Sequence, residues 1–334
     1  YNGSKRLKTI QQEKLNNQVA ELDVATSENS IQESIAQIYI QILYAAESVR
    51  VNENTLQVSI AQRDRGQELL NAGSIAKSDF AQLEAQVSTD RYQLVTAQAT
   101  LQDYKLQLKQ LLELDGENEM NIYLPALSDE NVLSPLPAKR DVYVSALALR
   151  PEIEASKLNV NASELGIDIA KSGYLPTVSL SAGIGTNHTS GSDFTFSEQV
   201  KNGWNNSIGL SVSVPIFNNR QTKSAVQKAK LQYETSMLSL LDEQKALYKT
   251  IEGLWLDANS AQQRYAAANE KLKSTQISYN LISEQFNLGM KNTVELLTEK
   301  NNLLQAQQEQ LQAKYMAILN TQLLKFYQGD KLAL

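Results

Sequence analysis

The segment Asn71-Ala72-Gly73-Ser74 has a later counterpart in Asn287-Leu288-Gly289-Met290, at an offset of 216 in the numbering. Each segment interrupts a long stretch of helical composition. Tyr1-Asn2-Gly3 and Phe217-Asn218-Asn219 are related by the same offset, and no gap is needed between these anchors. Because two segments of non-helical character fall in one register, we expect an internal duplication with this offset.

Each repeat is expected to form a helical hairpin. Residues 4–65 contain neither glycine nor proline, which allows a helix of about 93 Å at 1.5 Å per residue. A glycine at a helix end commonly adopts the left-handed conformation that stops the helix, so Gly73 and Gly289 are predicted to mark the turns.

The return helices have candidate caps and an apolar seam. Ser74 and either Asn292 or Thr293 are the predicted N-caps. The seam of the first return helix is interrupted once, by Asp90, and consists of Phe80, Leu83, Val87, Leu94, Ala97, Leu101, Tyr104, Leu108 and Leu111. The second return helix has a looser seam formed by Leu297, Leu304, Leu311 and Ile318. A sustained period of 3.5 residues predicts left-handed supercoiling against a partner helix.

The composition excludes several classes of chemistry. The 334 residues have a net charge of −6 and no basic run suited to nucleic acid, so no nucleic-acid partner is expected. Cysteine is absent and His188 is the only histidine, which excludes disulfides, thiol catalysis, histidine triads and multi-histidine metal sites. No pair of carboxylates stands out as an acid and a base. We therefore predict no catalytic residue, no metal and no cofactor, and no apolar run is long enough for a transmembrane helix.

Between the two repeats the pattern changes from a helical period to alternation. One run begins at Leu175 and the other follows Trp204, and each has about eleven residues, close to what a tilted strand needs to cross a bilayer. Small uncharged residues occupy one face. The predicted lipid-facing residues are Val178, Leu180, Ile184, Ile208, Leu210, Val212 and Val214. A transmembrane barrel hairpin and a soluble sandwich hairpin share this alternation, so the pattern alone leaves both open.

A lone hairpin cannot sit in a membrane, because its edges would leave backbone groups unpaired in hydrocarbon. Further strands must come from symmetry-related copies or from more chain. The offset leaves residues 151–216 without an N-terminal counterpart, and the chain opens at Tyr1 without an initiator methionine. We therefore expect the natural protein to extend before Tyr1 by at least about 66 residues, with a second strand pair and a signal sequence.

In this order, the segments resemble the TolC-like outer-membrane efflux proteins of Gram-negative bacteria, over essentially the whole chain. The most specific are Arg150-Pro151-Glu152-Ile153, Tyr174-Leu175-Pro176, residues 211–218, the two glycine turns with an acid six residues on, and residues 320–329. The resemblance implies an α+β membrane protein that forms a homotrimer. Its strands would contribute to an outer-membrane β-barrel, and its coiled-coil hairpins would form a large periplasmic α-barrel. The chain departs from the family by lacking the first strand pair and the helix before it.

The resemblance also implies a function and partners. The protein would be a passive exit duct that touches outer-membrane lipid, docks with a periplasmic adaptor protein and works with an inner-membrane pump. The implied adaptor-docking residues are Asn71, Gly73, Ser74, Asn287, Gly289 and Met290.

A gate is implied just past the turns. Lys291 and Asp79 resemble a basic and acidic pair that ties the coils together in the closed state. Glu295 matches the first acid of a ring that attracts cations, and Thr298 stands where a second acid is expected. Phe286 lacks the hydroxyl often found at its position and is expected only to pack.

The predicted division of the chain follows from these patterns. Its parts are a first helical hairpin (1–113), an equatorial segment with a lead-in helix (114–173), a transmembrane β-hairpin (174–217), a second helical hairpin (218–328) and a tail (329–334). The alternative is a soluble coiled-coil scaffold or periplasmic adaptor with a small β insertion. Two tandem hairpins separated by a strand pair argue against that alternative.

Overall fold

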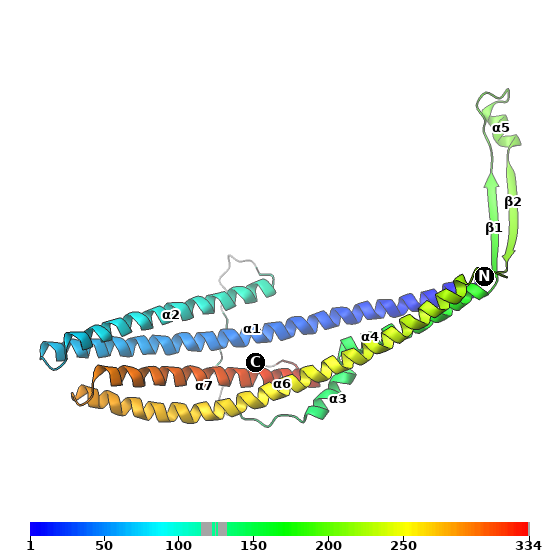
Figure 1. Cartoon of the computed structure of the whole chain (residues 1–334). Helices are drawn as coiled ribbons and strands as arrows, with labels where there is room; N and C mark the ends of the chain where they lie inside the picture. The colour runs from blue at the N-terminus through cyan, green and yellow to red at the C-terminus, as the bar shows by residue number, and fades with distance from the viewer. Residues whose placement is uncertain (115–121, 124, 126–131, 333–334) are drawn as a thin grey trace. The chain divides into compact units, whose positions relative to one another are not determined.

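The computed structural model describes residues 1–114, 122, 123, 125 and 132–332, so most of the predicted equatorial segment before Val132 lies outside the described residues (Figure 1). The chain divides into two compact units. The first combines Tyr1–Thr26 with Pro151–Lys245, and the second combines Ser27–Arg150 with Ala246–Leu334. The helices α1 (Lys5–Asn71) and α6 (Gln221–Asn287) contribute to both units. None of the described helices combines the length and the hydrophobicity needed to span a bilayer.

The long helices of the two halves have the same length and spacing. Helices α1 and α6 have 67 residues each, and α6 starts and ends at the expected offset from α1. The return helices α2 (Lys77–Leu111) and α7 (Thr293–Gln328) have 35 and 36 residues, and their first residues are related by the same offset. The two predicted helical hairpins are therefore both present.

A left-handed backbone precedes each long helix. The φ angles are +64° at Gly3 and +62° at Ser4, and they are +47° at Asn219 and +61° at Arg220. A Cβ on Gly3 would lie 2.9 Å from the Cβ of Leu175, so close approach of another segment requires glycine there. The anchors that suggested the offset thus share one backbone conformation.

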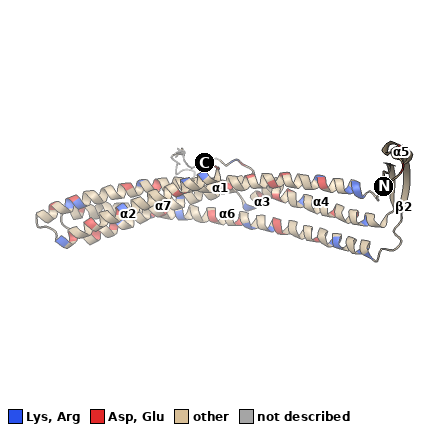
Figure 2. Cartoon of the chain, turned by 90° about the horizontal axis from the view of Figure 1, so that it is seen from above, with Lys and Arg blue, Asp and Glu red and all other residues tan. Residues whose placement is uncertain are grey.

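The first unit contains the predicted hairpin. Strands β1 (Thr177–Gly185) and β2 (Asn205–Ser213) pair antiparallel, and α5 (Phe196–Asn202) lies between them in the chain. The register places all the apolar residues on one face, and these are Val178, Leu180, Ala182, Ile184, Ile208, Leu210 and Val212. Serine, glycine and threonine dominate the other face, and neither strand contains a charged residue (Figure 2). The alternation is therefore as predicted.

The strands are shorter than predicted, with nine residues each. Val214, one of the predicted lipid-facing residues, lies one residue beyond the end of β2. The next residue is Pro215, which has no N–H to offer to a sheet ladder. The other edge of β1 is paired at its start, because Tyr1 and Val178 exchange two backbone hydrogen bonds of 2.8 Å.

Helical packing positions this sheet within the first unit. Helix α4 (Pro151–Lys171) and the short 3₁₀ helix η2 (Ser172–Tyr174) lead directly into β1. The start of α1 is bonded to α4 by an ion pair of 3.0 Å between Lys8 and Asp168. The hydroxyls of Ser163 and Ser236 join α4 to α6 at 2.8 Å.

The core of the second unit lies along the apolar seams. Every seam residue predicted on α2 and α7 is buried or half-buried, as expected for supercoiled helices. One cluster near the turns contains Leu83, Phe286 and Leu296, and a second includes Leu43 and Tyr315.

Arg150 follows α3 (Lys139–Leu149) in this unit and is buried. It forms an ion pair of 2.7 Å with Glu33 of α1 and lies 3.6 Å above the ring of Tyr327 on α7. The arginine of the Arg150-Pro151 segment therefore joins three helices.

Two helical glycines should respond oppositely to alanine. A Cβ on Gly66 would lie 2.3 Å from the Cδ1 of Leu83, which is buried, whereas a Cβ on Gly253 would meet nothing within 4 Å beyond its chain neighbours and the backbone of its own helix. Overpacking costs about 1–3 kcal/mol, and replacing a helical glycine by alanine gains about 1 kcal/mol. We expect Gly66→Ala to lower the thermal unfolding midpoint and Gly253→Ala to raise it. Equal increases in both variants would contradict close packing of α1 on α2.

Candidate functional site

Two turns of the same geometry close the helical hairpins of the second unit, and they lie at one end of it (Figure 1). The φ angle is +75° at Gly73 and +73° at Gly289. In each turn the glycine N–H donates to the carbonyl three residues back at 2.9 Å, and the next N–H donates to the carbonyl five residues back at 2.8 Å. This pattern is a Schellman motif, which satisfies the carbonyls at the helix end and confirms the predicted role of both glycines as helix stops.

The helices after the turns are capped differently. The Asn292 side chain accepts a hydrogen bond of 2.9 Å from the backbone N–H of Glu295, so this predicted N-cap is confirmed. The predicted cap at Ser74 is wrong, because the N–H of Ser74 completes the turn that ends α1, and α2 begins three residues later. Ala76 takes the cap position, and the carboxylate of Asp79 accepts its N–H at 3.4 Å.

The six residues predicted to dock an adaptor are all exposed, and they are Asn71, Gly73, Ser74, Asn287, Gly289 and Met290. A Cβ added to either glycine would meet no atom within 4 Å. The Arg65 guanidinium, near the end of α1, donates to the Asn287 carbonyl at 3.4 Å, so the two turns are neighbours. Leu288 and Met290 are 75% and 69% exposed. The paired turns therefore present open backbone flanked by apolar side chains.

The structure brings together two of the predicted gate residues. The Lys291 ammonium forms an ion pair of 2.5 Å with the carboxylate of Glu295, one turn along α7. This contact, helped by the backbone N–H of Asn292, lowers the pKa of Glu295. Asp79 instead lies at the start of α2, where it caps the helix. The pairing of Lys291 with Asp79 stays a prediction.

The two remaining gate residues have contrasting environments. Phe286 is buried against Leu83 and Leu296, which is a packing role. Thr298 is exposed, and its hydroxyl donates to the carbonyl of Val294 at 2.8 Å. Thr298 therefore offers a neutral side chain where a second acid was expected.

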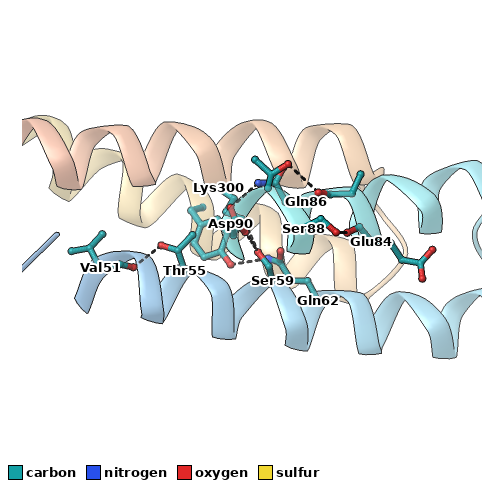
Figure 3. A network of polar contacts seen from close by, with 12 residues as sticks. Val51, Thr55, Ser59, Gln62, Glu84, Gln86, Ser88, Asp90 and Lys300 are labelled. Carbon is teal, nitrogen blue, oxygen red and sulfur yellow. Dashed lines mark hydrogen bonds and ion pairs between the residues drawn. The ribbon is translucent and has the colours of Figure 1, made fainter. Parts of the chain in front are cut away.

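A buried polar cluster was not predicted from the sequence. It joins Ser59 of α1, Asp90 of α2 and Lys300 of α7 (Figure 3). Asp90 was visible only as a break in an apolar seam. Lys300 lies four residues after Leu296 and three before Leu303, both buried, and this spacing on one helix face could have indicated a buried lysine. Among the described residues, no group of three or more His, Asp or Glu side chains could hold a metal ion.

Comparison with known proteins gives a consistent picture. The chain is 24% identical over 294 residues to the outer membrane efflux protein BepC of Brucella suis biovar 1 (strain 1330), which covers 87% of the chain and 61% of BepC. It is also 24% identical over 316 residues to the outer membrane protein TolC of Escherichia coli (strain K12), covering 90% of the chain and 62% of TolC. The chain thus spans about three fifths of the length of these relatives.

The fold has solved counterparts as well. CusC, whose crystal structures are described in connection with folding and transmembrane channel formation, superposes with a TM-score of 0.86 at 19% identity and covers 98% of this chain and 75% of CusC. The profile of the family described as outer membrane efflux protein matches residues 142–329. Because this match covers more than half of the chain, the chain belongs to the outer membrane efflux protein family and is located in the outer membrane.

Proposed function

We propose that this protein is a passive exit duct through the outer membrane and has no enzymatic activity. The observation that carries the proposal is the uncharged apolar face of the β-hairpin. Leu180, Ile184, Ile208 and Leu210 are between 71% and 84% exposed in the isolated chain. A contiguous face of this kind is not stable in water, and lipid is the environment that suits it.

The hairpin needs further strands to close a barrel. In the proposal, β1 and β2 join strands from the other copies of a homotrimer and from the rest of the protein, so that no edge faces hydrocarbon. The long hairpins line a periplasmic α-barrel. The proposal includes the predicted internal duplication, and the helices and left-handed anchors that recur at a constant offset in the two halves support it.

The partners follow from the turns. The exposed glycine turns at the end of the second unit suit docking of a periplasmic adaptor, which would connect the duct to an inner-membrane pump. Glycine leaves the backbone accessible, and Leu288 and Met290 add apolar contact area. Family membership favours this duct over a soluble coiled-coil scaffold, and BepC and TolC both have outer membrane names.

The two faces of the sheet should differ in their tolerance of arginine. The full protein should fractionate with detergent-extracted outer membrane. In Leu210→Arg the guanidinium would face lipid, at a cost of about 2–4 kcal/mol near the bilayer centre, and the amount of assembled protein should fall. The neighbouring variant Ser211→Arg and the equivalent Ser179→Arg place the charge on the opposite, polar face and should assemble better. Recovery in the soluble fraction, or equal losses from both faces, would contradict the duct.

The glycine turns can be tested for adaptor docking with a matched control. Gly289→Trp should abolish efflux of a fluorescent dye while the amount of assembled protein in the membrane stays unchanged. Gly191 also has a positive φ, +84°, and open space around its Cα, so Gly191→Trp imposes the same backbone strain away from the turns and should leave efflux intact. Photocrosslinkers at Ser74 or Lys291 should capture the adaptor in intact cells. Efflux that survives Trp at both Gly73 and Gly289 would place docking elsewhere.

The charges past the turns should control conductance. In the proposed gate, Lys291 ties the coils together in the closed state by pairing with Asp79. Lys291→Glu removes that cation and places a like charge one turn from Glu295, so single-channel conductance in planar bilayers should rise. Glu295→Gln should weaken cation preference and block by multivalent cations. Because the pKa of Glu295 is lowered, the carboxylate stays charged, and the cation preference should persist, to pH values below the ordinary glutamate range.

The control for this gate is Lys271→Glu. Lys271 forms an exposed ion pair of 2.7 Å with Glu309, joining α6 and α7 farther from the turns. Its reversal should leave conductance and selectivity near those of the unaltered protein. Equal effects of Lys271→Glu and Lys291→Glu would show that net charge, not the turn site, sets the conductance.

A further inference from the structure

Three helices of the second unit meet at one buried polar layer (Figure 3). Ser59 of α1, Asp90 of α2 and Lys300 of α7 are only 2–3% exposed. The Lys300 ammonium donates to the Asp90 carboxylate and to the Ser59 hydroxyl, and that hydroxyl donates to the same carboxylate oxygen. The Gln86 amide donates to the other carboxylate oxygen at 2.9 Å. Both oxygens of the buried carboxylate are therefore satisfied.

The two charges of this layer depend on each other. Burial lowers the pKa of Lys300, and the carboxylate of Asp90 opposes that shift. A charge left alone in such a site is strongly unfavourable, whereas an apolar pair of similar volume is often as stable as the ion pair. Stability alone therefore does not explain why the layer is charged.

Apolar layers lie on both sides of the polar one. Toward the turns, Leu83 and Leu296 pack with Phe286, and away from them Leu56 and Leu303 are buried three residues from Ser59 and Lys300. A seam of repeated leucines accepts more than one alignment of its helices, because apolar side chains are interchangeable. A single buried polar group in such a seam selects one alignment.

We propose that Ser59, Asp90 and Lys300 form a register lock that holds α7 on the α1–α2 hairpin and thereby fixes the stagger of the two turns. A slip of α7 by one helical turn, about 5.4 Å, would move Lys300 among leucines and leave Asp90 buried without its cation. The lock lies about 20 Å from the Gly73 turn along α1, at 1.5 Å per residue. The register lock joins α1, α2 and α7 into one rigid body. Relative movement at the turns is then left to α6 and to the segments between the lock and the turns.

This inference does not rest on the duct, because it concerns alignment within one chain. Its test uses the absence of cysteine from this sequence, which makes introduced cysteines unique within it. Ser74→Cys and Met290→Cys place spin labels at the two exposed turns of the full-length protein, co-expressed with unlabelled chain so that one labelled copy occurs per assembly. Pulsed electron paramagnetic resonance then reports the distance distribution between the turns.

Three variants separate a register lock from simple stabilisation. Lys300→Met leaves Asp90 buried without a partner. Asp90→Leu combined with Lys300→Met fills the layer with apolar side chains. Lys271→Met breaks the exposed ion pair between α6 and α7 and is the matched control, which should leave the distribution narrow.

A register lock predicts a particular combination of results. Lys300→Met should lower the unfolding midpoint by on the order of 10 °C. The double variant should recover most of that loss, yet show a second population of distances displaced by about 5 Å, one helical turn. A narrow, unshifted distribution in the double variant would overturn the proposal, since packing alone would then fix the register. Failure of the double variant to fold, or an unchanged midpoint in Lys300→Met, would overturn it as well.

Discussion

The reversal of a very long helix at a left-handed glycine is the constraint on which the second unit depends. Helices α1 and α6 have 67 residues each, and neither has a core of its own. Only the turns at Gly73 and Gly289 bring α2 and α7 back alongside them, so that the seams are covered. Most helical stability in proteins comes from such packing and not from intrinsic propensity. A turn with one residue of positive φ thus determines where the return helix after it, of 35 or 36 residues, packs.

The sequence predicted those features that depend on nearby residues. The glycine turns, the return seams, the cap at Asn292 and the alternation of the hairpin were all visible, because each is set by a local rule of backbone or periodicity. The cap at Ser74 was wrong because two local rules compete for that residue, and its N–H serves the preceding helix. The predicted end of the second strand was wrong because Pro215, which has no N–H for the sheet, stops the pairing earlier.

Features that join distant segments were not predicted. Lys300 and Ser59 are 241 residues apart, and the sequence around either residue does not indicate that the other is its partner. Asp90 was noticed as a polar break in the seam, but its partner could not be identified without the fold. The same holds for Arg150, whose contacts with Glu33 and Tyr327 bring together three helices. A polar residue in an apolar stripe indicates that it has a long-range partner, but only the tertiary structure shows which residue that partner is.

The two units reverse the usual distribution of polarity in different ways. The sheet turns Leu180 and Leu210 outward, and the helical unit turns Lys300 and Asp90 inward. In the proposed duct, lipid covers the apolar face of the sheet. A charged interior carries no information about surroundings, because both charges are compensated within the chain.

The polar layer also imposes an order in time. A ribosome makes Asp90 210 residues before it makes Lys300. During that interval the carboxylate of Asp90 has its hydrogen bonds from Ser59 and Gln86 within the α1–α2 hairpin and lacks the cation that pairs with it in the finished structure. Contacts between residues so far apart form late, after a large loop has been closed. The polar layer is therefore complete only once α7 has been made and has packed against α1 and α2.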